Sequence, residues 1–235
     1  MSSTLELHGV RAGYDAITVL HGVDLRVAAG EVAALLGPNG AGKTTTLRVA
    51  AGVRPVTAGR LVLGGRDVTG VDARELARVG VCLIPEGRGV FPNLSVSDNL
   101  LMMTFTGKTH AEIQEVAFSR FPTLARRADQ IAGTMSGGEQ QMLALARGLA
   151  TDPAVLLLDE LSMGLAPLVV ERLYEQVAEI ARQGVAVLVV EQFAAAVLEI
   201  ADHAAVLVRG RIEYQGPADR ELRRELPTLY LGSHR

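Results

Sequence analysis

The 235-residue chain has no tryptophan, a single cysteine and only 4% aromatic residues. One cysteine cannot form an internal disulfide, so the composition fits a reducing compartment. Cys82 lies in the apolar run 81–84, where we expect a small buried residue rather than a reactive thiol. No apolar run reaches the roughly 18 residues of a membrane-spanning helix, so we expect no span.

An excess of positive charge is also missing. The formal net charge is −3 at pH 7, which gives no support to nucleic-acid binding. Residues 1–6 have neither the basic start nor the apolar stretch of a secretory signal. The five histidines lack the spacing of a metal site, so histidine-based metal chemistry is not expected.

A glycine-rich stretch, Gly-Pro-Asn-Gly-Ala-Gly-Lys-Thr-Thr at residues 37–45, is the most informative part of the chain. It follows the apolar run 32–36 and precedes the helix-compatible run 45–51. Glycines let backbone N–H groups approach phosphate oxygens, and the start of a helix favours negative charge. We therefore predict a phosphate-binding loop for a nucleoside triphosphate. Its residues are Gly37, Pro38, Asn39, Gly40, Ala41, Gly42, Lys43, Thr44 and Thr45.

Two side chains of this loop carry chemistry. Lys43 is expected to reach the β- and γ-phosphates, and the hydroxyl of Thr44 is expected to bind Mg²⁺. An accidental glycine-rich turn is the alternative, but the strand before the loop and the helix after it favour the functional interpretation.

An apolar run at residues 155–158 ends in two acids, Asp159 and Glu160. Neighbouring side chains of a strand point to opposite sides, so the two carboxylates can have different roles. We predict that Asp159 holds Mg²⁺ and that Glu160 positions and polarises the water that attacks the γ-phosphate. The alternative is a pair of solvated acids at the end of a strand.

A second glycine pair stands directly before a helical run. Ser136 and Glu139 have the spacing of a capping box, which is the structural interpretation. Gly137 and Gly138 also expose the backbone at a helix start, which predicts a second anion site. A single fold is not expected to bring both cradles onto one nucleotide, so we predict two chains arranged head to tail.

The order of apolar runs predicts an α/β fold. We expect a P-loop NTPase core, an antiparallel β subdomain near the N-terminus and an inserted α-helical subdomain at roughly 86–150. All of these would belong to a single ATP-binding domain over residues 1–235. The runs expected to form buried strands are 81–84, 155–158, 185–190 and 204–208.

These motifs resemble those of the ATP-binding-cassette family: the phosphate loop, the signature at 135–140 and the acidic strand at 155–160. Together they cover nearly all of the chain. The resemblance implies a two-chain sandwich with ATP and Mg²⁺ at each shared interface. It also implies that Tyr14 stacks on adenine, for which a half-buried strand tyrosine is the alternative.

Four positions depart from the common family pattern. Glu86 stands where most members have glutamine, and Gln192 stands at the usual switch histidine. Leu161 replaces a proline, and Ala166 replaces an aspartate. The departures at positions 86, 166 and 192 together resemble the LivF-like cassette subunits of branched-chain amino-acid importers, whereas the leucine at 161 is a local departure.

That resemblance implies which residues act on ATP and magnesium. Glu86 and Gln192 would act in catalysis with Lys43 and Glu160. Glu86 would also lie near the metal, with Thr44 and Asp159. The transported substrate rests on the resemblance alone, since related importers carry urea, amides or other amino acids.

The resemblance also implies partners and a location. The partners are a second cassette subunit (LivG-like, or a second copy), integral membrane permease subunits and, indirectly, an extracytoplasmic substrate-binding protein, at the cytoplasmic face of the membrane. Segments 87–92 and 97–105 would dock on the permease. The residues that would form this apolar surface are Phe91, Leu100, Met102, Met103 and Phe105. Alternatively, these residues are the core of the helical subdomain.

Two other functions remain open at this point. One is a soluble cassette protein that acts on DNA or ribosomes, although such proteins usually have a long coiled-coil insertion or two cassettes in tandem. The other is an ATP-binding regulator without hydrolysis, which Glu86 and Gln192 favour and the intact pair Asp159 and Glu160 disfavours.

Overall fold

A computed structural model describes residues 4–87 and 89–231 of the chain. Two β-sheets form its framework. The four-stranded antiparallel sheet has the order β2 (Ile17–Val27), β1 (Leu5–Tyr14), β4 (Ala58–Leu63) and β5 (Arg66–Asp67). The six-stranded sheet has the order β10 (Arg211–Pro217), β9 (His203–Val208), β3 (Val32–Leu36), β8 (Ala186–Glu191), β7 (Val155–Asp159) and β6 (Val81–Ile84). All neighbours in the larger sheet are parallel except β10, which pairs antiparallel with β9.

Helices flank these sheets and fill the chain between the strands. The α-helices are α1 (Lys43–Ala50), α2 (Ala73–Arg78), α3 (Val96–Leu101), α4 (His110–Arg120), α5 (Pro122–Ala125), α6 (Gly137–Ala150), α7 (Pro167–Arg182), α8 (Ala194–Val197) and α9 (Arg220–Leu231). Two 3₁₀ turns are η1 (Met102–Thr106) and η2 (Ala132–Thr134). Within the described residues, none of these helices has the length and apolar character needed to cross a bilayer.

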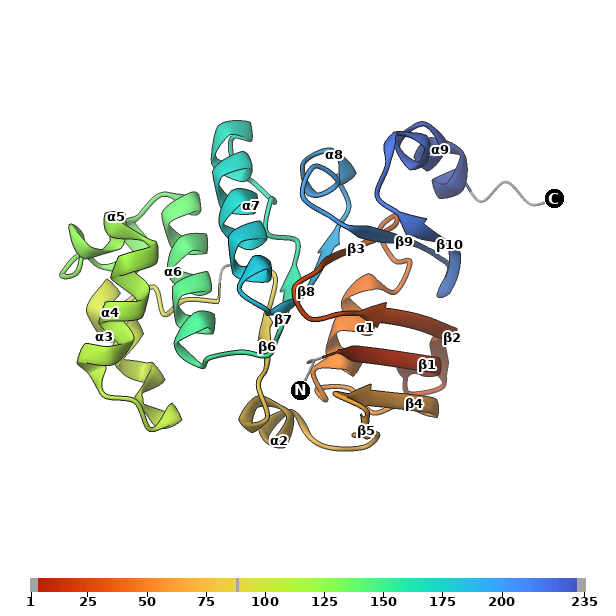
Figure 1. The fold of residues 1–235 in the computed structure, drawn as a ribbon, viewed down its shortest axis with the longest axis horizontal. Coiled ribbons are helices and arrows are strands. Elements are labelled where there is room, and N and C mark those ends of the chain that lie inside the picture. The colour runs from red at the N-terminus through yellow and green to blue at the C-terminus, as the bar shows by residue number, and fades with distance from the viewer. Residues whose placement is uncertain (1–3, 88, 232–235) are drawn as a thin grey trace.

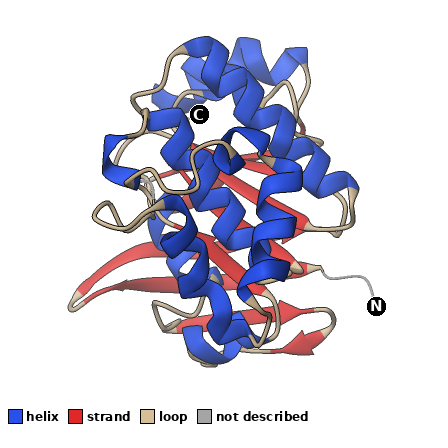
Figure 2. Cartoon of the chain, turned by 90° about the vertical axis from the view of Figure 1, so that its left-hand side faces the viewer, coloured by secondary structure: helices blue, strands red, loops and turns tan. Residues whose placement is uncertain are grey.

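The antiparallel strands and the helices α3–α5 lie at opposite ends of the molecule, with the six-stranded sheet, α6 and α7 between them (Figure 1). From the helical end, the helices lie in front of the strands (Figure 2). The predicted combination of a nucleotide-binding core, an antiparallel sheet and a helical insertion matches this arrangement.

Two apolar layers enclose the six-stranded sheet. Side chains of β8 alternate between them: Val187 and Val189 face the cluster formed with α6 and α7, whereas Leu188 and Val190 face the cluster formed with α1, β1 and β2. Because both faces are covered, parallel strands of this kind are almost continuously apolar. This explains why the sequence predicts β6, β7 and β8 correctly.

The helical segment shares its core with the sheet. Leu143 and Leu145 of α6 belong to the same buried cluster as Leu156 of β7 and Val187 of β8. The described part of the segment 86–150 is therefore packed onto the sheet by a common core. Its status as a separate subdomain stays a prediction.

Local capping sets the start of several helices. The side chain of Ser95 accepts a hydrogen bond from the backbone N–H of Asp98, so α3 begins at Val96. The α-helix ends at Leu101 and continues as a 3₁₀ turn to Thr106, where Gly107 takes the left-handed conformation. The segment 96–106 thus consists of an α-helix followed by a 3₁₀ turn.

The strand β8, one of the two middle strands of the six-stranded sheet, should contribute strongly to the stability of the fold. We expect Leu188→Ala to lower the free energy of unfolding by about 2–5 kcal/mol, because it leaves a cavity in a fully buried layer. Leu168→Ala, at an exposed leucine of α7, is the matched control and should change it by less than about 0.5 kcal/mol. Urea unfolding of both variants is the measurement, and equal effects would contradict this account of the core.

Candidate nucleotide-binding site

The glycine-rich loop connects the end of β3 to the start of α1, and close packing requires its glycines. A Cβ on Gly37 would lie 2.2 Å from the carbonyl oxygen of Leu207. Gly42 has φ +108° and precedes the first residue of α1, in a backbone conformation that other residues rarely adopt. The loop therefore turns tightly and presents backbone rather than side chains, as a phosphate cradle requires.

Lys43 is held beneath this loop with only 5% of its side chain exposed. Its Nζ donates hydrogen bonds to the carbonyl oxygens of Gly37 at 2.9 Å and Pro38 at 3.3 Å. The same ammonium lies 3.7 Å from Oε1 of Glu160. The positive charge of Lys43 is thus fixed between the loop and the acidic end of β7. Phosphate oxygens bound by the loop would lie next to this charge.

Asp159 is buried at the end of β7. The hydroxyl of Thr44 donates a hydrogen bond to its Oδ1 at 3.3 Å. Burial raises the pKa of Asp159 to about 6, and the negative charges of Glu160 and Glu86 raise it as well. An ionised Asp159 would be stabilised by a cation at this point.

The oxygen donors of the site suit magnesium. Mg²⁺ is usually bound by one or two carboxylates together with substrate phosphates and water, rather than by a complete protein cage. The hydroxyl of Thr44 and the carboxylate of Asp159 could serve in this way. Among the described residues no three His, Cys, Asp or Glu side chains converge as metal ligands. The metal role of the exposed Glu86 stays a prediction.

Glu160 occupies a sharp corner after β7. Its φ is +47°, in the left-handed region, and its backbone N–H donates to the carbonyl of Val190 at 3.0 Å. The following residue, Leu161, is fully buried. Residues other than glycine rarely adopt this backbone conformation, so the surrounding contacts must stabilise it. By doing so they also set the direction of the Glu160 carboxylate.

Nine of the predicted residues line one cleft of about 530 Å³, whereas Gly37, Pro38, Ala41 and the buried Asp159 do not line it. Its lining residues come from the phosphate loop and from the ends of neighbouring strands. They are Val19, Asn39, Gly40, Gly42, Lys43, Thr44, Thr45, Glu86, Glu160, Met163 and Gln192. The carboxyl ends of β3, β6, β7 and β8 lie at the same edge of the sheet, which is where open α/β sheets bind ligands.

Gln192 has a neighbour that the sequence did not reveal. The hydroxyl of Tyr230, on α9, donates a hydrogen bond to the backbone carbonyl of Gln192 at 3.3 Å. Burial raises the pKa of Tyr230 to about 12, so this hydroxyl keeps its proton at neutral pH. No local pattern signals this contact, because the two residues are 38 positions apart.

Tyr14 lies at the end of β1 and is not among the residues that line the cleft. Its hydrogen bond with Thr45 and the nearby Arg48 lower its pKa. Arg48 donates to the Tyr14 hydroxyl at 3.2 Å, and the guanidinium of Arg54 lies 4.2 Å from the ring centroid. One ring face is thus occupied by an arginine, and stacking of the other face on adenine stays a prediction. Sequence reasoning missed both arginines.

The second cradle, at the start of α6, is a complete capping box. The Glu139 carboxylate accepts from the backbone N–H of Ser136 at 3.0 Å and from its hydroxyl at 2.9 Å. Gly138 is needed for packing, because a Cβ there would lie 2.3 Å from Cγ1 of Val169 on α7. The four predicted residues Ser136, Gly137, Gly138 and Glu139 are not among those that line the cleft. The structure therefore places the two cradles apart in the single chain.

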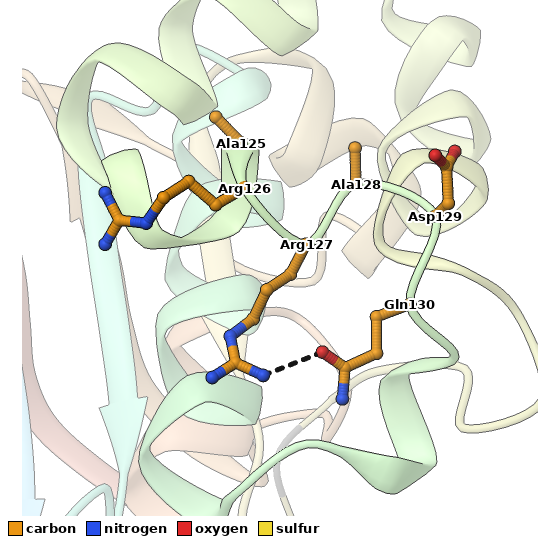
Figure 3. A pocket seen from close by; sticks show the side chains of 6 residues that line it. All are labelled: Ala125, Arg126, Arg127, Ala128, Asp129 and Gln130. Carbon is orange, nitrogen blue, oxygen red and sulfur yellow. Dashed lines mark hydrogen bonds between the residues drawn. The ribbon is translucent and has the colours of Figure 1, made fainter.

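A shallow pocket lies beside this second cradle, over residues 125–130 (Figure 3). Arg127 donates from Nη1 to Oε1 of Gln130 at 2.8 Å, while Arg126 points away from it. The Nε of Arg127 also lies 3.0 Å from Oε1 of Glu139. Arg127 thus ties this loop to the capping box.

The predicted docking surface is partly wrong. Phe91, Met102 and Phe105 are exposed, with 74% for Phe105. Leu100 and Met103, however, are buried, because Leu100 lies on the face of α3 that points into the core and Met103 packs beside it. Leu101 is exposed instead. In the predicted segment 87–92, Arg88 lies outside the described residues.

The sequence pattern of a family described as "ABC transporter" matches residues 20–162, more than half of the chain. The chain belongs to the ABC transporter family. It is 42% identical over 210 residues, 88% of this chain and 90% of the relative, to the high-affinity branched-chain amino acid transport ATP-binding protein BraG of Pseudomonas aeruginosa. It is 34% identical over 220 residues, 92% of this chain and 93% of the relative, to the probable branched-chain amino acid transport ATP-binding protein LivF of Archaeoglobus fulgidus.

Solved structures of ATP-binding cassettes share its fold. The ADP conformation of MJ1267, an ATP-binding cassette of an ABC transporter, superimposes with a TM-score of 0.87 at 26% identity and covers 98% of this chain and 99% of that one. A nucleotide-free ATP-binding cassette gives a TM-score of 0.84 at 26% identity, over 96% and 95% of the two chains. The predicted family, the predicted fold class and the assignment as an ABC ATPase are confirmed.

The buried Asp159 should make stability depend on pH. In the folded chain its pKa is raised from 3.8 to about 6, so the folded state holds the proton more tightly than the unfolded state. Stability contributed by this group therefore falls as the pH rises from about 4 to 6. Without nucleotide or Mg²⁺, we expect Asp159→Asn to raise the urea midpoint more at about pH 8 than at about pH 5.

Asp129→Asn, at an exposed aspartate, is the control for this experiment and should shift neither midpoint. Equal gains for Asp159→Asn at both pH values would contradict the assigned shift in pKa.

Proposed function

We propose that this chain is the ATP-hydrolysing subunit of an importer that takes up branched-chain amino acids. The observation that carries the proposal is the convergence of Lys43, Asp159 and Glu160 around the phosphate loop. The substrate class is supported by the names of two relatives, BraG and LivF, which match along nearly their whole length.

The residues of the cleft would divide the work on ATP. Backbone N–H groups of the loop 37–45 bind the phosphates, and Lys43 neutralises the β- and γ-phosphate charge. Thr44 and Asp159 would hold Mg²⁺, which neutralises the same charge when bound. The carboxylate of Glu160 orients the attacking water and accepts its proton. Gln192, which also lines the cleft, would donate a neutral hydrogen bond towards the γ-phosphate.

A second chain would complete each site. Because the cradle at 136–139 is not part of the cleft in its own chain, it is free to face the nucleotide of a partner arranged head to tail. Either a second copy or a different cassette subunit can take this place. Nucleic acid has no part in this proposal.

The remaining partners are membrane subunits. We place the chain at the cytoplasmic face of the membrane, bound to permease subunits that receive cargo from an extracytoplasmic binding protein. The exposed side chains Phe91, Met102 and Phe105 are candidates for the docking surface. Residues 1–235 would form a single ATP-binding domain, in which roughly 86–150 is the helical subdomain that docks.

Two substitutions separate binding from hydrolysis in the assembled complex. Lys43→Ala should weaken ATP binding at least about tenfold and lower turnover with it, because the phosphates lose their cation. Glu160→Gln should bind ATP within about twofold of the wild type but lose at least about 100-fold in turnover, and should trap the closed dimer. ATP binding, turnover and uptake of labelled leucine into vesicles are the measurements.

Glu115→Gln, at an exposed glutamate of α4, is the matched control and should behave like the wild type. Normal turnover by Glu160→Gln would remove Glu160 from its assigned role. Turnover without uptake of leucine, isoleucine or valine would contradict the substrate class and leave the ATPase assignment intact.

The glutamine at the switch position should slow hydrolysis. A histidine there can carry a positive charge and contact the γ-phosphate as a cation, whereas Gln192 donates only as a neutral amide. We expect Gln192→His to raise the single-turnover rate in the assembled complex by about threefold or more. Gln215→His, at an exposed position of β10, should leave it unchanged. An unchanged or lower rate for Gln192→His would refute this interpretation.

A further inference from the structure

Glu191, the last residue of β8, is a buried carboxylate that has no part in the mechanism above. Only 1% of it is exposed. No ion pair to it is found among the described residues, although an isolated buried carboxylate is costly unless hydrogen bonds satisfy it. A buried carboxylate at the end of this strand therefore calls for an explanation.

Three donors from two segments satisfy this carboxylate. Its Oε1 accepts from the backbone N–H of Ser162 at 3.0 Å and from the hydroxyl of Tyr174 on α7. Its Oε2 accepts from the hydroxyl of Ser162 at 2.9 Å. The carboxylate thus clamps the turn that follows Glu160 to the end of β8. The hydroxyl of Tyr174 holds the carboxylate itself in place.

The position of Glu191 in the sheet links this clamp to the rest of the cleft. It pairs in register with Leu36, the residue before the phosphate loop, while its neighbour Val190 pairs with Asp159. The next residue in the chain is Gln192. In the sheet, Glu191 therefore lies next to the strand that leads into the phosphate loop, one residue from the partner of Asp159 and one residue before the switch position.

The corner at Glu160 needs such a support. Glu160 adopts φ +47°, and a non-glycine residue keeps this conformation only where its surroundings fix it. On one side its N–H donates to Val190, and on the other side Ser162 is held by Glu191. Leu161 has no proline ring to restrict the corner, so hydrogen bonds must do this.

We propose that Glu191 is a positioning residue for ATP hydrolysis, which aims the carboxylate of Glu160 at the attacking water through Ser162 and Tyr174. This rests on the proposed ATPase function and deepens it. The hydrogen bonds of the clamp position the carboxylate of Glu160 and do not involve the phosphate loop. Loss of the clamp should therefore lower kcat and leave the affinity for ATP unchanged.

The test compares Glu191→Ala and Glu191→Gln in the assembled complex. Glu191→Ala should lower kcat at least about tenfold, while the Kd of a non-hydrolysable ATP analogue stays within about twofold. Glu191→Gln keeps an acceptor for Ser162 and Tyr174 and should return kcat to within about threefold of the wild type. A kcat of Glu191→Ala within about twofold of the wild type would overturn the proposal. So would an equal loss of kcat and analogue affinity together with a lower melting temperature.

Milder variants decide the question if Glu191→Ala does not fold. Tyr174→Phe and Ser162→Ala each remove one hydroxyl and should each lower kcat about threefold with unchanged analogue affinity. Their controls are Tyr214→Phe and Ser119→Ala, whose hydroxyls bond to Pro217 and Val116 away from the cleft. Wild-type kcat in both Tyr174→Phe and Ser162→Ala would overturn the proposal.

Wild type and Glu160→Gln run beside these variants separate the two levels of the argument. An inactive wild-type complex would contradict the proposed function itself. An active wild type, an inactive Glu160→Gln and a fully active Glu191→Ala would overturn only the role of Glu191.

Discussion

The register between β3, β8 and β7 is the constraint on which the rest of the structure depends. Leu36 pairs with Glu191, and Asp159 pairs with Val190, so three strand ends reach the same edge together. Because side chains alternate between the two faces of a strand, a slip of one residue would exchange the two apolar layers and turn the acids away from the loop. Packing of the sheet core therefore also fixes the chemistry at its edge.

Without a nucleotide, the groups around the cleft are energetically unfavourable. Burial and neighbouring negative charge disfavour ionisation of Asp159, and the left-handed backbone of Glu160 costs about 1–3 kcal/mol. Packing and hydrogen bonds in the sheet must offset these free-energy costs. A site of this kind gives up stability for groups that are already aligned when the substrate arrives.

Local patterns made part of this structure predictable. The loop 37–45 is contiguous and flanked by a strand and a helix, and the strand at 81–84 has the bounds that its apolar run indicates. The acids at 159–160 follow their strand directly. These features depend on neighbours in the chain, which a sequence displays. The strand β10 was not predicted, although its residues alternate between polar and apolar as a half-buried strand does.

The contacts that shape the site depend on distant segments and could not be predicted. Tyr230 reaches Gln192 from α9, and Tyr174 reaches Glu191 from α7. The prediction of the docking surface failed in part for a related reason. Whether the apolar side chains at 100–103 lie in the core or at the surface depends on the orientation of α3 about its axis. That orientation is a property of tertiary packing, not of composition.

The close approach of Gly138 to Val169 has a consequence for an assembly of two cassettes. Gly138 belongs to the cradle that would face a partner's nucleotide, and α7, which carries Val169, begins seven residues after the Glu160 that would act on the chain's own nucleotide. At this contact the backbone of Gly138 packs directly against the side chain of Val169, with no room for a Cβ on residue 138. In the proposed dimer, this contact would join the cradle that faces one nucleotide to the helix that follows the Glu160 acting on the other.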